Sequence, residues 1–186
     1  MNVAYSDTPG APGEMKTVGE IMVPLEQYPC VRDDTTLREA VEVIENAQID
    51  VGGRKSLPRG LLVYDDIGVY VGFTRRRDIM RGLEPGFLVA KPLEYRKKLF
   101  DVAVDPNLTE LSWDHVVKGM REQGEKPIRE VMRPIEATLE AGDHVIKAVY
   151  EMVTLDVSPI PVLKNGQVVG VVRTVDVFHE LGLLLS

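Results

Sequence analysis

The amino-acid sequence predicts a mixed α/β (α+β) fold made of two copies of one small unit. A seven-residue pattern recurs at Val18–Pro24 and Ile128–Pro134, and the same apolar helical stripe follows each copy of it. A strand-to-helix junction also recurs, at Gly72–Ile79 and Gly170–Val177. A unit of about 60 to 70 residues buries too little surface to be stable alone, so we expect the two copies to pack together.

Each copy opens with a short helical turn. In the two opening segments the apolar positions, a glutamate, a methionine and a proline recur in the same order. Thr17 and Glu20 have the spacing of a capping box, and Pro127 suits the first position of a helix. Pro24 and Pro134 should end the two turns, because proline breaks a continuing helix.

A longer helix follows each opening turn. Its apolar residues have the i, i+3, i+4, i+7 spacing of one buried stripe. They are Leu37, Ala40, Val41 and Ile44 in the first copy, and Val145, Ala148, Val149 and Met152 in the second. We expect Asp34 or Thr35 to be the N-cap of the first helix and Asp143 that of the second, because these side chains can accept hydrogen bonds from first-turn N–H groups.

Two β-rich runs then predict an antiparallel hairpin in each copy, and each hairpin leads directly into a last helix. The predicted strands are Leu61–Tyr64 and Val69–Phe73 in the first copy, and Ile160–Leu163 and Gln167–Val172 in the second. Asn165-Gly166 is typical of a two-residue hairpin turn. Gly68 can supply the positive φ that the longer turn of the first copy needs.

Two stretches lie outside the repeat. The insertion at 48–60 contains Gly52-Gly53-Arg54-Lys55-Ser56, which is compatible with a surface loop or with a phosphate-binding loop that lacks the full Walker spacing. Between the copies, three apolar residues share one side of a helix predicted between positions 112 and 124. They are Val116, Val117 and Met120. This connecting segment can pack on the repeats, pair two chains or hold a partner protein.

The order of these motifs, found twice, resembles the CBS domain family. Each half resembles one CBS domain, and together they resemble the tandem pair called a Bateman module, over Thr17–Leu83 and Pro127–Leu183. The resemblance implies two β-α-β-β-α units packed sheet to sheet around a pseudo-twofold axis, often paired with a second chain. We therefore divide the chain into a disordered lead-in (1–16), a first repeat (17–84), a helical connecting segment (85–126) and a second repeat (127–186).

The resemblance also implies an adenosine-containing ligand such as AMP, ADP, ATP or S-adenosylmethionine. In CBS domains an aspartate at the start of the last helix holds the ribose hydroxyls, and this residue corresponds to Asp78 and Asp176. A carboxylate suits the task because it can accept hydrogen bonds from two adjacent hydroxyls. A serine or threonine three residues earlier usually contacts the phosphate, whereas this chain has Arg75 and Arg173 at those positions.

The two arginines leave two interpretations open. An arginine beside a helix N-terminus can bind phosphate through its planar donor fork, with Thr74 or Thr174 one position away. The same arginines can instead fill the clefts between the repeats and exclude a ligand. The remaining candidates for the clefts are Ile160 and Pro161, which the resemblance places beside the base, and Tyr28 and Thr138, which lie between an opening turn and its helix.

Charge and composition limit the possible functions. The formal net charge of −7 argues against broad binding to nucleic acid or membranes, although 54–81 holds seven Lys or Arg against three Asp and could face an anion. No apolar run approaches the length that spans a bilayer. Cys30 is the only cysteine, so an internal disulfide is impossible and a reducing, cytoplasmic setting is expected.

No catalytic or metal-binding pattern is visible in the sequence. His115, His144 and His179 have no second ligand at a suitable spacing, and no nucleophile motif is present. We therefore expect a non-enzymatic regulatory module that needs no cofactor, binds an adenosine-containing nucleotide, forms a homodimer and acts on a separate protein partner. The alternative is a dimerising interaction scaffold whose clefts are blocked by arginine and bind no nucleotide.

Overall fold

The computed structural model describes residues 16–51, 53–86 and 113–185, and these residues divide into two compact units. The described parts of Met1–Tyr28, Gln48–Ser56 and Ile135–Ser186 form unit 1. The described parts of Pro29–Ala47 and Leu57–Pro134 form unit 2. Each unit therefore takes the helices and hairpin of one sequence repeat and the opening segment of the other.

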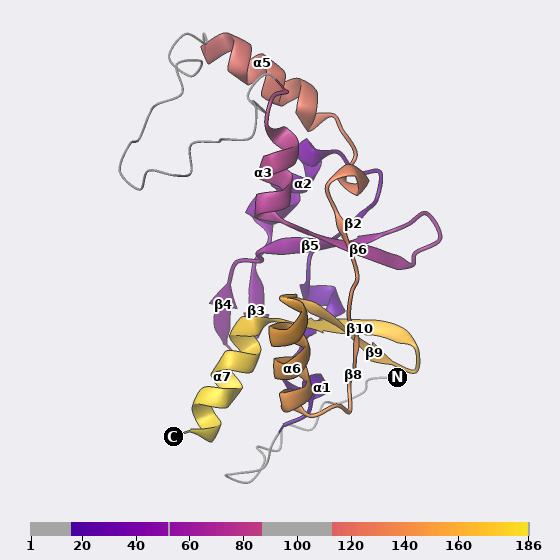
Figure 1. Ribbon diagram of the computed structural model, residues 1–186, viewed down its shortest axis with the longest axis vertical. Helices are drawn as coiled ribbons and strands as arrows, with labels where there is room; N and C mark the ends of the chain where they lie inside the picture. Colours follow the sequence, from indigo (N-terminus) through magenta and orange to yellow (C-terminus); the bar gives the residue numbers. More distant parts are fainter. Residues whose placement is uncertain (1–15, 52, 87–112, 186) are drawn as a thin grey trace. The chain divides into compact units, whose positions relative to one another are not determined.

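Unit 1 contains a four-stranded sheet with the order β1-β10-β9-β8. Strands β8 and β9 are parallel, and the other neighbours are antiparallel. Helices α6 and α7 lie side by side on one face of this sheet (Figure 1). The elements of unit 1 are α1 (Val18–Ile21), β1 (Val23–Pro24), η1 (Leu25–Gln27), β3 (Ile49–Val51), β4 (Arg54–Ser56), β8 (Leu139–Glu140), α6 (Val145–Leu155), β9 (Ile160–Lys164), β10 (Gln167–Val172) and α7 (Thr174–Leu184).

The core of unit 1 lies between this sheet and its helices. The stripe predicted for α6 is confirmed, because Val145, Ala148 and Met152 are buried in the same cluster as Ile160 and Val162 of β9. The predicted hairpin is also confirmed, with Asn165-Gly166 at its turn and a positive φ at both residues. Burial of one apolar face per element is the main stabilising contribution here.

Unit 2 contains a four-stranded sheet with the order β2-β5-β6-β7. Strands β2 and β5 are parallel, and the other neighbours are antiparallel. The predicted stripe of α2 is confirmed, with Leu37, Ala40 and Ile44 buried against β5. The elements of unit 2 are β2 (Cys30–Arg32), α2 (Leu37–Asn46), β5 (Gly60–Tyr64), β6 (Tyr70–Arg75), α3 (Arg76–Leu83), α5 (Trp113–Gly124), η2 (Ile128–Glu130) and β7 (Arg133–Pro134).

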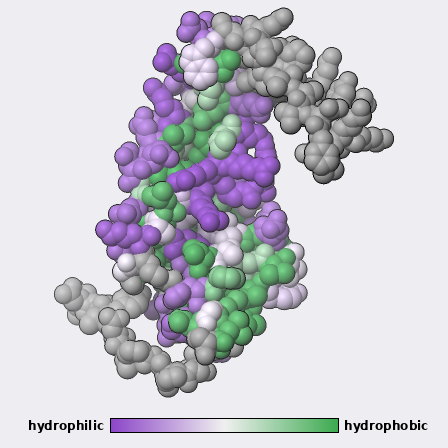
Figure 2. All heavy atoms as spheres, turned by 90° about the vertical axis from the view of Figure 1, so that its left-hand side faces the viewer, coloured by the Kyte–Doolittle hydropathy of each residue, from purple (hydrophilic) through white to green (hydrophobic). Residues whose placement is uncertain are grey.

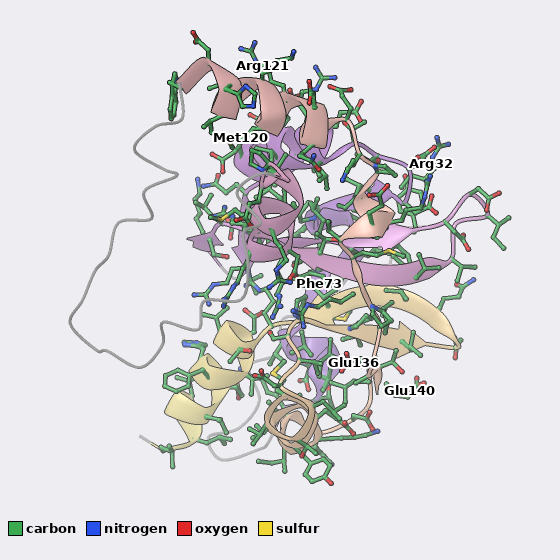
Figure 3. All side chains as sticks on the ribbon, turned by 45° about the horizontal axis from the view of Figure 1, so that its top comes forward. Arg32, Phe73, Met120, Arg121, Glu136 and Glu140 are labelled. Atoms are coloured by element: carbon green, nitrogen blue, oxygen red, sulfur yellow. The ribbon has the colours of Figure 1, made fainter. Side chains whose placement is uncertain are left out.

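Helix α5 is the described part of the connecting segment, whose residues 87–112 lie outside the described ranges. The helix predicted between positions 112 and 124 is confirmed. It packs against both α2 and α3 and presents Met120 and Arg121 near its middle (Figure 3). Gly124 ends this helix in a buried position beside Arg38 and Leu83. Within the described residues, the connecting segment thus supplies a helix that packs beside α2 and α3 of unit 2.

The opening segments are exchanged between the two repeats. Strand β1 of the first repeat pairs with β10 of the second, and β7 of the second repeat pairs with β6 of the first. The recurring glycine of the strand-to-helix motif makes this pairing possible. A Cβ atom at Gly170 would lie 2.4 Å from the Val23 carbonyl oxygen, and one at Gly72 would lie 2.8 Å from the Arg133 carbonyl oxygen.

The structure corrects the predicted N-caps of α2 and α6. The first is Thr36, whose hydroxyl accepts from the Glu39 N–H at 3.3 Å while the Glu39 carboxylate accepts from the Thr36 N–H at 2.9 Å. The prediction of Asp34 or Thr35 is wrong because this reciprocal capping box fixes the start of the helix one position later. The second N-cap is His144, since the Asp143 carboxylate instead accepts from the Glu140 N–H at 2.8 Å.

The insertion at 48–60 also differs from its prediction. Residues 49–51 and 54–56 form two paired strands, because β3 and β4 pair antiparallel with Ile49 opposite Ser56. Ile49 is fully buried, so it anchors the hairpin to the protein. A strand hairpin uses its backbone N–H groups for pairing, which leaves fewer of them for a phosphate. Ser56, at the end of β4, belongs to unit 1.

Candidate functional site

In each unit an aspartate lies in the first turn of the helix that directly follows the hairpin, at the junction with the preceding strand. Asp78 at the start of α3 is 2% exposed, and Asp176 at the start of α7 is 4% exposed. Each carboxylate accepts the backbone N–H of the residue three positions earlier, at 3.2 Å from Arg75 and 3.3 Å from Arg173. This is the geometry in which an acidic residue stabilises a helix N-terminus.

In unit 1, Arg173 forms a two-point ion pair with Asp176. The distances are 2.6 Å from Nε to Oδ2 and 2.7 Å from Nη2 to Oδ1. The Nη1 group donates to the Ser56 hydroxyl at 2.8 Å, so strand β4 holds the far side of the guanidinium. Only 11% of the Arg173 side chain is exposed. Arg173 is therefore fixed by three hydrogen bonds inside unit 1.

In unit 2, three arginines share Asp78. Arg75 donates through Nε to Oδ2 at 2.9 Å and through Nη2 to Oδ1 at 3.3 Å. Arg133 of β7 donates through Nε to Oδ1 at 3.3 Å, and Arg81 of α3 places Nη1 3.8 Å from the same oxygen. The Arg75 side chain is 35% exposed, and those of Arg81 and Arg133 are more so. The hydrogen bonds of the arginine side chains to Asp78 are longer than those to Asp176, and the arginines that donate them are more exposed to solvent.

The electrostatics of the two sites differ accordingly. Burial acts to raise the pKa of Asp78, but the hydrogen bonds from Arg75 and the charges of Arg75 and Arg133 outweigh it and hold the pKa below its ordinary value. Among the described residues, three guanidinium groups lie within 3.8 Å of the Asp78 carboxylate. Arg173 and Asp176 cancel each other, so the same position in unit 1 is neutral.

The two predicted threonines have different environments. Thr74 on β6 is fully buried and lies opposite Leu61 in the sheet. Among the described residues its hydroxyl has no hydrogen-bond partner. Thr174 is exposed, and its N–H donates to the Ser158 hydroxyl at 3.1 Å. Phe73, labelled in Figure 3, lies on β6 beside Thr74 and two residues before Arg75.

The other four candidates all belong to unit 1. Ile160 and Pro161 are buried on β9 opposite Val172 and Val171 of β10, so Ile160 lies level with the last strand residue before Arg173. Tyr28 is buried directly after η1, and Thr138 is exposed directly before β8. The close polar contacts described for Asp176 are those of Arg173, and the four candidates are not among them.

Two residues of these sites escaped the sequence reasoning. Ser56 contacts Arg173 across 117 positions, and Arg133 contacts Asp78 across 55 positions. A signal for Arg133 was present, because the aligned position of the first opening segment is the apolar Val23. No comparable signal marks Ser56, which lies in an insertion without a counterpart in the second repeat.

Within the described ranges, no helix combines the length and apolarity that crossing a membrane requires. The same residues contain no group of three or more His, Cys, Asp or Glu side chains placed to hold a metal ion.

Comparisons with solved structures show the same architecture in other proteins. The CBS-pair protein CBSX2 from Arabidopsis thaliana is 18% identical over 92% of this chain and 98% of its own, with a TM-score of 0.57. The CBS domain of a CBS domain-containing membrane protein from Sphaerobacter thermophilus is 20% identical over 90% of this chain and 88% of its own, with a TM-score of 0.61. At such identities the likeness concerns the fold.

A further match is a structure of CBSX2 in complex with AMP, which is 16% identical over 92% of this chain and 99% of its own, with a TM-score of 0.58. Comparison with curated protein sequences gives no match. The sequence pattern of the CBS domain matches residues 18–85 and 128–183, which is most of the chain. These two matches coincide with the two repeats, so the chain belongs to the CBS domain family and carries its domains as a tandem pair.

Proposed function

We propose that this CBS pair is a regulatory module that binds an adenosine-containing nucleotide and thereby modulates a separate partner. The observation that carries the proposal is the buried aspartate paired with an arginine at the start of the last helix in each unit. A carboxylate can accept both ribose hydroxyls, and a guanidinium beside a helix N-terminus can bind phosphate. The AMP complex of CBSX2, a protein of the same fold, supports this choice of ligand.

Binding at such a site requires an exchange of hydrogen bonds. The aspartate oxygens already accept from arginine, so ribose hydroxyls must replace at least one of these donors. An arginine released from the carboxylate can then turn towards a phosphate of the same ligand. One side-chain movement would thus serve both ends of the nucleotide and couple ligand binding to the last helix, as a switch between two states requires.

The proposal is tested by thermal unfolding of the full chain with AMP, ADP, ATP and S-adenosylmethionine. A ligand that binds the folded chain alone must raise the melting temperature. We expect at least one of these ligands to do so, and we expect Asp78→Asn with Asp176→Asn to reduce the shift. Protein that is free of carried-over nucleotide and shows no shift with any of them would refute nucleotide sensing.

A second candidate function is a dimerising interaction scaffold, and the exposed face of α6 and α7 favours it. Figure 2 shows apolar side chains gathered over the lower part of the molecule, where Figure 1 places these helices. Phe178 on α7 is 75% exposed. The large apolar residues of α6 and α7 that are exposed are Ile146, Tyr150, Val153, Leu155, Val175, Phe178, Leu183 and Leu184.

A second copy of the chain is the occupant that we propose for this face. In unit 2 the corresponding helices α2 and α3 are covered by α5, whereas no described element of unit 1 covers α6 and α7 in this way. Ile146, Tyr150 and Val153 follow the i, i+4, i+7 spacing of one helical stripe, which a twofold axis can place against itself without opposing like charges. Dimerisation is compatible with nucleotide sensing as well as with the scaffold.

A further inference from the structure

The two aspartate sites differ in the residues that surround them, although the repeat aligns them. The basic residues near Asp78 align with neutral or apolar residues of unit 1. The exception is Arg75, which aligns with Arg173. In sequence alignment the pairs are Arg76 and Thr174, Arg77 and Val175, Arg81 and His179, and Arg133 and Val23. Five of the seven Lys or Arg residues of the segment 54–81 belong to unit 2.

Three arginines gather around the Asp78 carboxylate. Arg75, Arg81 and Arg133 all lie within 3.8 Å of it, and water and salt only partly screen the repulsion between neighbouring guanidinium groups. The Nε atom of Arg76, in the first turn of α3, is buried and has no acceptor among the described residues. A doubly charged anion would offset this repulsion and offer an acceptor to Arg76.

The arginine of unit 1 has the opposite character. Arg173 donates three hydrogen bonds inside the unit, to both oxygens of Asp176 and to Ser56, and is nearly excluded from solvent. Releasing it would break all three bonds and leave a buried charge without a partner, which is costly. Arg75 has longer bonds to its aspartate and is three times as exposed, so it exchanges partners more easily.

We infer that unit 2 alone binds the phosphate of the ligand, through Arg75, Arg81 and Arg133, and that Arg173 closes the equivalent site of unit 1. The inference rests on the proposed nucleotide binding and narrows it to phosphate-bearing nucleotides with one site per chain. Adenosine, which lacks the phosphate, and S-adenosylmethionine, which carries a sulfonium cation instead, bind weakly or not at all. Arg133 determines which of the two sites binds phosphate, since the aligned position of the first opening segment is the apolar Val23.

Isothermal titration calorimetry of the full chain with AMP, ATP, adenosine and S-adenosylmethionine tests the inference. We expect one phosphate-bearing nucleotide per chain, affinity that falls with added salt, and no measurable heat from the other two compounds. Arg133→Ala should weaken AMP binding roughly tenfold or more, because it removes a charge-assisted hydrogen bond. Arg133→Lys should retain part of the affinity. Arg121→Ala removes an exposed arginine of α5 in the same unit and should leave the affinity unchanged.

The outcomes separate this inference from the proposed function. Binding of adenosine or S-adenosylmethionine as tightly as AMP, two AMP molecules per chain, or unchanged AMP affinity in Arg133→Ala would each overturn the inference and leave nucleotide sensing intact. Absence of binding by all four compounds would refute nucleotide sensing itself. Thermal unfolding of each variant without ligand shows whether it is folded, and Arg133→Lys serves as the second variant if Arg133→Ala is not.

Discussion

Asp78 and Asp176 are almost excluded from solvent, and each keeps an arginine three residues earlier in the chain as its partner. A buried carboxylate without a partner would be strongly destabilising, so these arginines have a structural task in the ligand-free protein. The same guanidinium can serve a phosphate when the ribose takes over the carboxylate. Under the proposed function, closing the site and binding phosphate are therefore two states of one arginine side chain, and its local contacts would decide between them.

Removing the carboxylate of unit 1 should be costly. Asp176→Ala leaves the Arg173 side chain buried with Ser56 as its remaining partner among the described residues, and we expect the free energy of unfolding to fall by about 3 kcal/mol. Chemical denaturation measures this change. Glu125→Ala is the control, because Glu125 pairs with Arg38 where both side chains are exposed, and its loss should cost less than about 1 kcal/mol. Equal losses of unfolding free energy in Asp176→Ala and Glu125→Ala would contradict the burial of the Arg173 and Asp176 pair.

Because of Asp78, the free energy of unfolding should depend on pH in the acid range. Its pKa in the folded chain lies below the ordinary value, so the unfolded chain takes up a proton first as the pH falls. The stabilisation by the arginines is therefore complete above the unfolded pKa of about 4 and is lost as the pH falls through the folded pKa. Denaturant titrations between neutral pH and pH 3 or so should show a weaker acid-side loss in Asp78→Asn than in the natural chain.

The sequence identified the aspartates and the arginines as candidates because both lie in one recurring motif, but it did not predict that they pair with each other. Ser56 and Arg133 were not identified, because their contacts depend on how distant segments pack. The repeat aligned the two sites and so suggested that they are equal. The side chains that make them unequal come from an insertion, whose Ser56 contacts the Arg173 side chain, and from an opening segment, which pairs with the hairpin of the other repeat. Sequence similarity identifies neither contact.

The glycines of the last helices illustrate the element scale. A Cβ atom at Gly82 of α3 would lie 2.6 Å from Val131 Cγ1 and 2.8 Å from Leu37 Cδ1, whereas one at Gly182 of α7 would meet no atom within 4 Å. We therefore expect Gly82→Ala to lower the melting temperature. Gly182→Ala should instead raise the free energy of unfolding by about 0.5 to 1 kcal/mol through helix propensity. Thermal and denaturant unfolding of the two variants check both signs, and stabilisation by Gly82→Ala would contradict the close approach of Val131 and Leu37.

The cap of α2 provides a second prediction at this scale. Thr36→Ala removes the hydroxyl that accepts the Glu39 N–H and should cost about 1 kcal/mol of unfolding free energy. Thr36→Ser keeps the hydroxyl and is the matched control. Denaturant unfolding measures both variants, and a Thr36→Ala chain as stable as the Thr36→Ser chain would show that the capping box is not formed.

Helices and hairpins followed from the sequence because their signals are local. The apolar stripes of α2 and α6 and the turn at Asn165-Gly166 each fix one element without reference to the others. The observed helix starts differ from the predicted ones because several residues that can act as N-cap are adjacent in the sequence. At α2 the reciprocal hydrogen bonds of Thr36 and Glu39 form the cap. The hairpin at 49–56 lacked a strong strand pattern and depends on the burial of Ile49.

At the scale of the whole molecule, the fold makes each unit from both repeats. The chain enters unit 2 after Tyr28, returns to unit 1 for Gln48–Ser56 and enters it for the last time after Pro134, so Arg133 is the second-last residue before this last change of unit. A ligand that takes Arg133 from Asp78 would therefore act directly on a segment that continues from unit 2 into unit 1. This connection gives the proposed sensor a physical route from the ligand to the rest of the chain.

The apolar face of α6 and α7 predicts the oligomeric state. Size-exclusion chromatography with light scattering should find the natural chain as a dimer and Phe178→Asp as a folded monomer, because the substitution places a charge in the centre of the proposed interface. Ile67→Asp, at an exposed turn of unit 2, is the control and should remain dimeric. A monomeric natural chain would rule out the dimer, and a dimeric Phe178→Asp would place the interface elsewhere.

The most direct test of the central claim observes the arginines themselves. Nuclear magnetic resonance of the Nε–Hε groups, assigned by single arginine-to-lysine substitutions, follows Arg75, Arg133 and Arg173 in one sample while AMP is added. We predict that the signals of Arg75 and Arg133 shift as AMP saturates its site, whereas the Arg173 signal, held by Asp176 and Ser56, stays in place. A shift of Arg173 without one at Arg133, or no shift of any of the three, would contradict the account.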